Sequence, residues 1–202
     1  MNLILTSMGL STESLLKECG KLLTKPTNEI RALIMYIEYP SPPFNIHMNL
    51  AKQCFSDLGI LVENIQTFDL YADNPPSLRD VDLMLVFGGN EYRYMDQIRK
   101  QGMYSDIRDF VDRNGVYIGI SASSIIMGPT VDVEKWSRAS NDVGLKDKSG
   151  FGYVDFITVP HVDSISERGQ KVVDFHKSTG HKMMYITNKQ GILVLDDMYK
   201  II

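Results

Sequence analysis

Short runs of consecutive apolar residues alternate along this chain with longer stretches in which apolar residues recur every three or four positions. The clearest short runs are 83–87 (LMLVF) and 116–120 (VYIGI). Strands that are apolar at consecutive positions are buried on both faces, which is typical of parallel sheets covered by helices. We therefore predict an α/β fold. It should have a doubly wound, mostly parallel central sheet, helices on both faces and right-handed crossovers.

The same patterning gives the expected elements. Strands are expected at Leu3–Thr6, Ile30–Ile37, Ile60–Ile65, Leu83–Phe87, Val116–Ile120 and Val154–Val159. Helices are expected at Ser11–Leu23, Asn45–Leu58, Ser77–Asp82, Glu91–Gly102, Ser105–Asn114 and Ser164–Ser178. Short strands at 183–187, 191–195 and 198–202 predict a small antiparallel addition at one edge. Residues 129–152 should form a long loop, and the 202 residues suit a single domain over 1–202.

Composition narrows the function classes. The 21 basic and 25 acidic residues give a net charge of −4, which argues against a general nucleic-acid binder. The apolar runs are too short for a membrane-spanning helix, and the N-terminus lacks the basic region of a signal peptide. The two cysteines, Cys19 and Cys54, are not part of a metal-ligand motif. We expect a cytoplasmic protein with reduced thiols, without metal, membrane partner or nucleic acid.

The first site candidate is Ser121, at the end of the expected strand 116–120. A strand that turns sharply into a helix exposes the hydroxyl of the turn residue above the sheet, and the next backbone N–H can stabilise an oxyanion. Small neighbours are required, and Gly119, Ala122 and Ser123 meet that need. Helix capping or a satisfied core hydroxyl explains Ser121 equally well. A second Gly-x-Ser, Gly9-Leu10-Ser11, also follows a strand, and there we favour capping by Ser11 or Thr12.

Two further strand ends carry chemistry. Gly88-Gly89-Asn90 allows a tight turn that brings backbone N–H groups close to a ligand, although Asn90 could simply cap the following helix. His161 follows the expected strand 154–159 and is the one histidine of four placed at such an end. Ligands bind at the carboxyl ends of strands in open α/β sheets, so an imidazole there could act as a general base. A structural role for His161 stays open.

Taken in order, the motifs around Gly88-Gly89-Asn90, Gly119-Ile120-Ser121-Ala122 and Pro160-His161 resemble those of the peptidase E family of serine peptidases. The similarity extends from Leu83 to the 185–191 segment (YITNKQG) and covers most of the chain. That family includes alpha-aspartyl dipeptidases and cyanophycinases, on a fold like that of class I glutamine amidotransferases. The resemblance implies Ser121 as nucleophile and His161 as base. The N–H groups of Gly89 and Ala122 would form the oxyanion hole. No cofactor is implied.

Two positions depart from the family pattern. Ser123 stands where the family usually has glycine, and we expect its extra atoms to loosen the turn. Asn188 stands where members often carry a carboxylate that orients the histidine. An asparagine can fix the tautomer but cannot stabilise the imidazolium by charge. Gln190 is an alternative orienter, and the carboxylates of Asp163, Asp142 and Glu134 could also serve.

An acid-specific member would need a cation for the substrate carboxylate, and arginine binds carboxylates in bidentate fashion. The candidates are Arg93, Arg138 and Arg168; of these, Arg168, with Gly88 and Asn90, is assigned to substrate binding. Tyr92, Tyr94 and Trp136 could line the pocket, or simply pack in the core. The 129–152 loop could act as a lid that selects substrates.

We therefore expect a serine-type, dipeptidase-like hydrolase of small peptides, which could form a homodimer. The alternative is a relative with weak or no activity that binds or regulates through the same pocket, which Ser123 and Asn188 motivate. A flavodoxin-like nucleotide module has less support, because the sequence contains neither GxGxxG nor GxxxxGK[ST].

Overall fold

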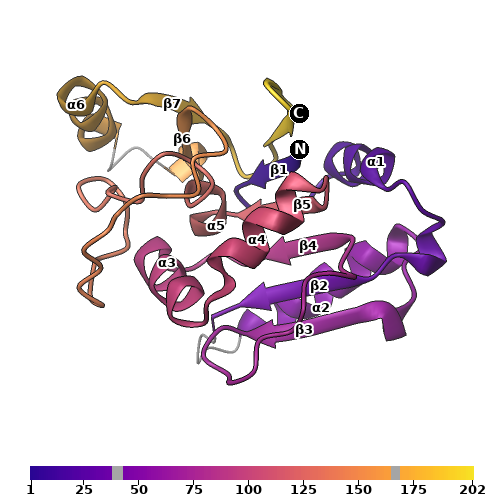
Figure 1. The fold of residues 1–202 in the computed structure, drawn as a ribbon. Helices are drawn as coiled ribbons and strands as arrows, with labels where there is room; N and C mark the ends of the chain where they lie inside the picture. The colour runs from indigo at the N-terminus through magenta and orange to yellow at the C-terminus, as the bar shows by residue number, and fades with distance from the viewer. Residues whose placement is uncertain (38–42, 165–168) are drawn as a thin grey trace.

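The computed structural model describes residues 1–37, 43–164 and 169–202 (Figure 1). Its central sheet has seven strands in the order β3-β2-β4-β5-β1-β8-β9. Their bounds are β1 Asn2–Thr6, β2 Ala32–Tyr36, β3 Ile65–Asp69, β4 Leu83–Val86, β5 Val116–Ile120, β8 Gly191–Leu195 and β9 Met198–Ile201. Strands β3, β2, β4, β5 and β1 are parallel, whereas β8 and β9 add on in antiparallel fashion. The predicted fold class is confirmed, including its antiparallel C-terminal edge.

Helices cover both faces of this sheet. Helices α1 (Glu13–Leu22) and α2 (Pro43–Asp57) pack against one face, where Ile4, Ile34 and Ile118 point. Helices α3 (Glu91–Lys100) and α4 (Met103–Asp112) pack against the other, with neighbouring strand residues such as Leu3, Leu33 and Tyr117. Because successive strand side chains alternate between faces, a continuous apolar run supplies both cores at once.

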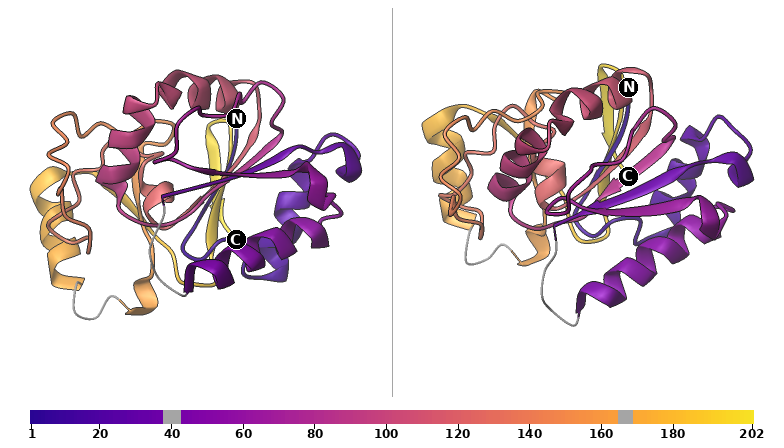
Figure 2. Two further views of the ribbon diagram at one scale, coloured as in Figure 1. Left: turned by 90° about the horizontal axis from the view of Figure 1, so that it is seen from below. Right: turned by 60° about the horizontal axis from the view of Figure 1, so that its bottom comes forward.

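A second, two-stranded parallel sheet lies apart from the first. It consists of β6 (Phe156–Val159) and β7 (Lys182–Tyr185). Helix α6 (Gly169–Thr179) packs against it through Val172 and Phe175. In Figure 2 this unit and the 129–152 segment lie together at one end of the molecule, opposite α1 and α2. The expected strands 154–159 and 183–187 therefore exist in shortened or shifted form, but outside the central sheet.

Further expected elements differ from the structure. The strand expected at Ile60–Ile65 is wrong, because β3 begins at Ile65 and residues Val62–Asn64 form a 3-10 turn with an exposed Val62 side chain. No helix forms at 77–82, where Leu78 and Val81 are buried in turns. The helix expected from Ser164 is observed from Gly169, and 165–168 lie outside the described residues.

The 129–152 segment has little regular structure, as predicted, but it is held to the body of the protein. The guanidinium of Arg99 donates to the carbonyls of Asp147 and Ser149, and that of Arg108 donates to the carbonyl of Phe151. Trp136 is buried beside Phe175 of α6. These contacts are those of a packed connection rather than of a free lid.

Candidate active site

Ser121 occupies a sharp turn between β5 and α5 (Ala122–Ile125), with φ 54° and ψ −109°. A positive φ is uncommon for a residue with a side chain and costs energy that the surrounding structure must offset. Helix and strand approach so closely that a Cβ on Gly119 would lie 2.7 Å from the Ser123 carbonyl oxygen. A side chain at Gly119 would therefore clash, in line with the expectation that the neighbours of Ser121 are small.

Hydrogen bonds to the end of β1 fix this turn. The Ser121 N–H donates to the Thr6 carbonyl at 2.8 Å, and the Ser124 hydroxyl lies 2.9 Å from the same carbonyl. In return, the Thr6 N–H donates to Ser124 Oγ, also at 2.9 Å. The neighbouring strand β1 therefore holds the strained backbone of Ser121 in place.

Ser123 tightens the turn, so the expectation that it would loosen it is wrong. Its hydroxyl is fully buried, donates to the Val86 carbonyl at 2.6 Å and accepts from the Ile120 N–H at 2.6 Å. These bonds join β4 to the end of β5. The extra atoms that set it apart from glycine are the ones that make this connection.

His161 faces Ser121 from the end of β6. Its Nε2 lies 3.0 Å from Ser121 Oγ, within the range expected of a base and its nucleophile. The backbone of His161 also has a positive φ, 61°, and its N–H donates to Ser7 Oγ at 3.1 Å. Ser7 is fully buried and donates in turn to the Ile186 carbonyl.

Asn188 completes the contact on the other side of the imidazole. Its Oδ1 lies 2.6 Å from Nδ1 of His161. An amide oxygen only accepts, so the Nδ1 position carries the proton and Nε2 is left to accept from the Ser121 hydroxyl. The backbone of Asn188 is itself held, because its N–H donates to Asp163 and its carbonyl accepts from Ser11 Oγ.

The alternative orienters are engaged elsewhere. Gln190 Oε1 accepts from the Thr187 N–H at 3.0 Å, which closes the turn that carries Asn188. Asp142 forms an ion pair with Arg93, and Glu134 is exposed on the 129–152 segment. Asp163 supports the Ser121–His161–Asn188 relay indirectly, because its Oδ1 accepts from the Asn188 N–H at 2.9 Å.

The Gly-Gly turn after β4 approaches Ser121. A Cβ on Gly88 would lie 3.2 Å from Ser121 Cβ. Asn90 accepts from the N–H groups of Tyr92 and Arg93, and its Nδ2 donates to the Ser140 carbonyl. The helix-capping alternative for Asn90 is therefore confirmed; its assignment to substrate binding stays a prediction.

The cation and aromatic candidates lie on the surface, pack in the core, or fall outside the described part. Arg93 holds Asp142 on the surface, Arg138 is exposed, and Arg168 belongs to the undescribed segment 165–168. Tyr92 and Trp136 are fully buried packing residues, and the Tyr92 hydroxyl accepts from the Val133 and Glu134 N–H groups. Tyr94 is also buried and reaches the Gly88 carbonyl with its hydroxyl.

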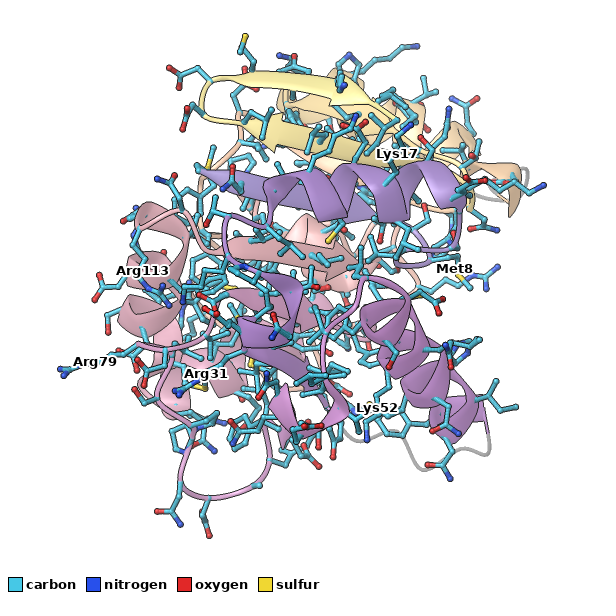
Figure 3. All side chains as sticks on the ribbon, turned by 90° about the vertical axis from the view of Figure 1, so that its right-hand side faces the viewer. Met8, Lys17, Arg31, Lys52, Arg79 and Arg113 are labelled. Atoms are coloured by element: carbon cyan, nitrogen blue, oxygen red, sulfur yellow. The ribbon has the colours of Figure 1, made fainter. Side chains whose placement is uncertain are left out.

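A cavity of about 620 Å³ opens beside Ser121 and His161. It lies at the carboxyl ends of four parallel strands. The residues that directly follow these strands line it: Ser7, Ile37, Phe87 and Ser121. Figure 3 shows Met8, another lining residue, at the edge of the molecule, with α2 below it. Ligand sites in open α/β sheets are expected at the carboxyl ends of the strands, and the cavity lies there. Residues 129–152 contribute none of its described lining.

Glu91, the first residue of α3, has a buried carboxyl group. Burial raises its pKa, and its Oε1 has no hydrogen-bond partner among the described residues. The Ser137 side chain hydrogen-bonds to the carboxyl group and opposes this shift. A buried acid with an unsatisfied oxygen is a source of instability near the Gly-Gly turn.

Sequence reasoning missed Ser7, Ser11 and the α2 wall of the cavity. Ser7 directly follows β1, so the rule that strand ends converge would have found it. The α2 residues His47, Leu50, Ala51 and Cys54 recur at helical spacing, but their pattern resembles an ordinary core face.

Comparison with known proteins places the chain in a family. The model of peptidase family S51 matches residues 3–202. The chain belongs to peptidase family S51. It is 28% identical to an uncharacterized peptidase of Pasteurella multocida over 149 residues, 71% of each chain. It is also 28% identical to Escherichia coli peptidase E over 119 residues, or 57% of this chain, and that match spans about half of the relative (48%).

Solved structures agree on the fold. A candidate peptidase E protein from Listeria monocytogenes superposes with a TM-score of 0.78 at 21% identity, covering 99% of this chain and 96% of the other. A peptidase from an acI-B1 actinobacterium gives 0.74 at 14% identity, covering 100% and 86%. The family membership confirms the predicted resemblance and the predicted class, a serine-type peptidase.

The described residues contain no helix that is both long and apolar enough to cross a membrane. They also contain no group of three or more histidine, cysteine or acidic residues placed to hold a metal ion.

Proposed function

We propose that this S51 peptidase hydrolyses small peptides, in the manner of a dipeptidase, through a covalent acyl-enzyme on Ser121. One observation carries the proposal. Ser121 Oγ lies 3.0 Å from His161 Nε2, and His161 Nδ1 lies 2.6 Å from Asn188 Oδ1. A nucleophile, a base and an orienting acceptor in this sequence form the arrangement used for acyl transfer.

In the first step, Ser121 Oγ attacks the carbonyl carbon of the scissile peptide bond while its proton passes to His161 Nε2. Negative charge develops on the former carbonyl oxygen. We assign its stabilisation to the N–H groups of Gly89 and Ala122. Ala122 is the first residue of α5, so its N–H has no acceptor within the helix. A Cβ on Gly88 would lie 3.2 Å from Ser121 Cβ, so the Gly88-Gly89 turn comes close to Ser121, which supports the role of Gly89.

In the second step, the C–N bond breaks and the imidazolium returns the proton to the leaving amine. Water then attacks the acyl-enzyme, giving its proton to His161, and release of the acid restores the Ser121 hydroxyl. Positive charge therefore appears on His161 twice in each turnover.

Asn188 faces that positive charge with a neutral oxygen. It fixes the tautomer but adds no charge, whereas replacing the acid of a serine triad by an amide can cost roughly 10⁴ in turnover. We infer a slow enzyme. This feature also favours the second candidate function, a binding or regulatory protein that retains the pocket. Gly88, Asn90 and Arg168 remain our assignments for substrate contacts.

The test is hydrolysis of a dipeptide library by the wild-type chain, followed by mass spectrometry, with Ser121→Ala and His161→Ala in parallel. Products from wild type that both variants fail to form support the peptidase mechanism. Saturable binding of dipeptides without any product, unchanged in Ser121→Ala, would favour the binding protein instead.

A further inference from the structure

One face of α2 forms a wall of the cavity beside Ser121. Its lining residues are His47, Leu50, Ala51 and Cys54, at positions i, i+3, i+4 and i+7, which lie on one side of a helix. Leu50 is 56% exposed although it is a large apolar residue. An exposed leucine that faces a cavity next to a nucleophile is a surface available to a ligand.

The strand ends supply further apolar walls. Ile37, Leu85, Phe87 and Ile120 line the cavity from β2, β4 and β5 or the residues after them. Phe87 lies against Phe44 of α2, with ring centroids 5.8 Å apart. Aliphatic and aromatic groups thus surround the space between the sheet edge and α2.

Three of the polar lining groups, those of Ser7, Ser11 and Cys54, already have hydrogen-bond partners. The Ser7 hydroxyl donates to the Ile186 carbonyl, and the Ser11 hydroxyl donates to the Asn188 carbonyl. The Cys54 thiol donates to the Leu10 carbonyl, and burial raises its pKa, so it stays neutral. Among the described residues that line the cavity, none is a lysine, arginine, aspartate or glutamate.

We propose that this cavity selects an apolar side chain on the residue whose carbonyl Ser121 attacks. This inference rests on the proposed function and assigns its substrate class. The cavity volume falls within the roughly 300–1,000 Å³ of small-molecule sites. A substrate carboxylate placed there would leave water without gaining a lysine or arginine from the described walls, which is unfavourable. Burial of a leucine side chain favours binding by roughly tenfold to a hundredfold.

The experiment uses two diphenyl aminoalkylphosphonates that differ only in carrying a leucine or an aspartate side chain. Ser121 Oγ forms a bond to phosphorus, phenoxide leaves, and the serine proton passes through His161. The rate is followed by the increase in intact mass, and a simple alkyl fluorophosphonate reports reactivity without a side chain. Wild type should react with the leucine reagent at least tenfold faster than with the aspartate reagent.

Two variants place a cation on opposite sides of α2. Leu50→Arg puts it on the cavity face, whereas Asn49→Arg puts the same charge on an exposed position outside that face. Leu50→Arg should lower the leucine-to-aspartate rate ratio by at least tenfold, because it removes apolar surface and adds a partner for the carboxylate. Asn49→Arg should leave the ratio within about twofold of wild type, as expected for an exposed, screened charge.

Four results would overturn the inference. A wild-type preference for the aspartate reagent would contradict it and would favour the assignment of Arg168 to a substrate carboxylate. Equal shifts in Leu50→Arg and Asn49→Arg would show that α2 does not line the binding space. If the alkyl fluorophosphonate reacts at Ser121 but side chains make no difference, the subsite fails and the proposed function stands. If no reagent reacts, both fail.

Discussion

Two Gly-x-Ser turns follow adjacent strands of the same sheet, and only one presents its serine to a histidine. After β1, Ser11 precedes Thr12, the helix cap, whose side chain accepts from the Leu15 N–H. The Ser11 hydroxyl donates to the Asn188 carbonyl. After β5, Ser121 has a positive φ and lies 3.0 Å from His161 Nε2. The motif is shared, but the backbone conformation and the facing residue are not.

The difference shows what sets a proposed nucleophile apart from another serine at a strand end. Ser11 lies just before helix α1, and its hydroxyl supports the relay by holding the Asn188 backbone carbonyl. Gly119 lets α5 approach β5 closely, while the hydroxyls of Ser123 and Ser124 tie the Ser121 turn to β4 and β1. Chemistry therefore depends on a strained turn that its neighbours hold, and short sequence motifs do not record this.

The largest effect should come from removing each serine in turn. Ser121→Ala should lower kcat/KM for a cleaved dipeptide by roughly 10⁴-fold or more, because the nucleophile is lost. Ser11→Ala removes a single partly exposed hydrogen bond and should cost at most about tenfold. Steady-state kinetics on the two variants tests this; comparable losses would mean that the two turns are not distinct in function.

Next in size is the loss of the bonds that hold the Ser121 turn. Ser123→Ala should lower the free energy of unfolding by about 1–3 kcal/mol, because the buried Ile120 N–H and Val86 carbonyl lose their partner. Urea denaturation measures this. Ser105→Ala, on the exposed surface of α4, is the control and should change stability by less than about 0.5 kcal/mol. Equal stability of Ser123→Ala and wild type would show that the turn does not depend on Ser123.

A gain of activity is expected where the relay lacks charge. Asn188→Asp keeps an oxygen at His161 Nδ1 and adds a negative charge that stabilises the imidazolium. We expect kcat to rise by about tenfold with little change in KM. Asn188→Ala, which removes the acceptor, should lower kcat. A rate unchanged in both variants would show that Asn188 does not orient the histidine.

The smallest effect concerns the third turn, after β4. Burial raises the pKa of Glu91, so the folded state favours the protonated carboxyl. The stability this group contributes is therefore present at acidic pH and is lost as the pH rises through its folded-state pKa. Glu91→Gln should raise Tm at neutral pH, with the difference shrinking below the ordinary carboxyl range. Thermal melts across this pH range would contradict the account if the difference were constant or largest in acid.

Apolar runs gave the parallel strands well, because strands buried on both faces leave an unmistakable pattern. The bounds of β5 and β8 match the expectation residue for residue. Strand β3 is different: it lies at the sheet edge, and its Gln66 and Thr67 are exposed. The strand was therefore predicted in the more apolar run just before it, at 60–65, although Val62–Asn64 in that run form a 3-10 turn.

The site was predictable to the extent that it follows from strand ends. Ser121, His161 and Gly88 all follow strands and line one cavity. The role of Ser123 was not predictable. The sequence shows only that its side chain is larger than that of glycine, and not that its hydroxyl bonds to the Ile120 N–H and the Val86 carbonyl. Nor could the sequence show that β6 leaves the central sheet, because its pattern is that of any buried strand.

The most direct test of the relay is labelling of the folded chain by a fluorophosphonate, followed by peptide mapping. A single adduct on Ser121 is predicted. It should be absent from Ser121→Ala, much slower in His161→Ala, and faster in Asn188→Asp. An adduct on Ser7 or Ser11, or no adduct on folded protein, would contradict the assignment of Ser121 as the nucleophile.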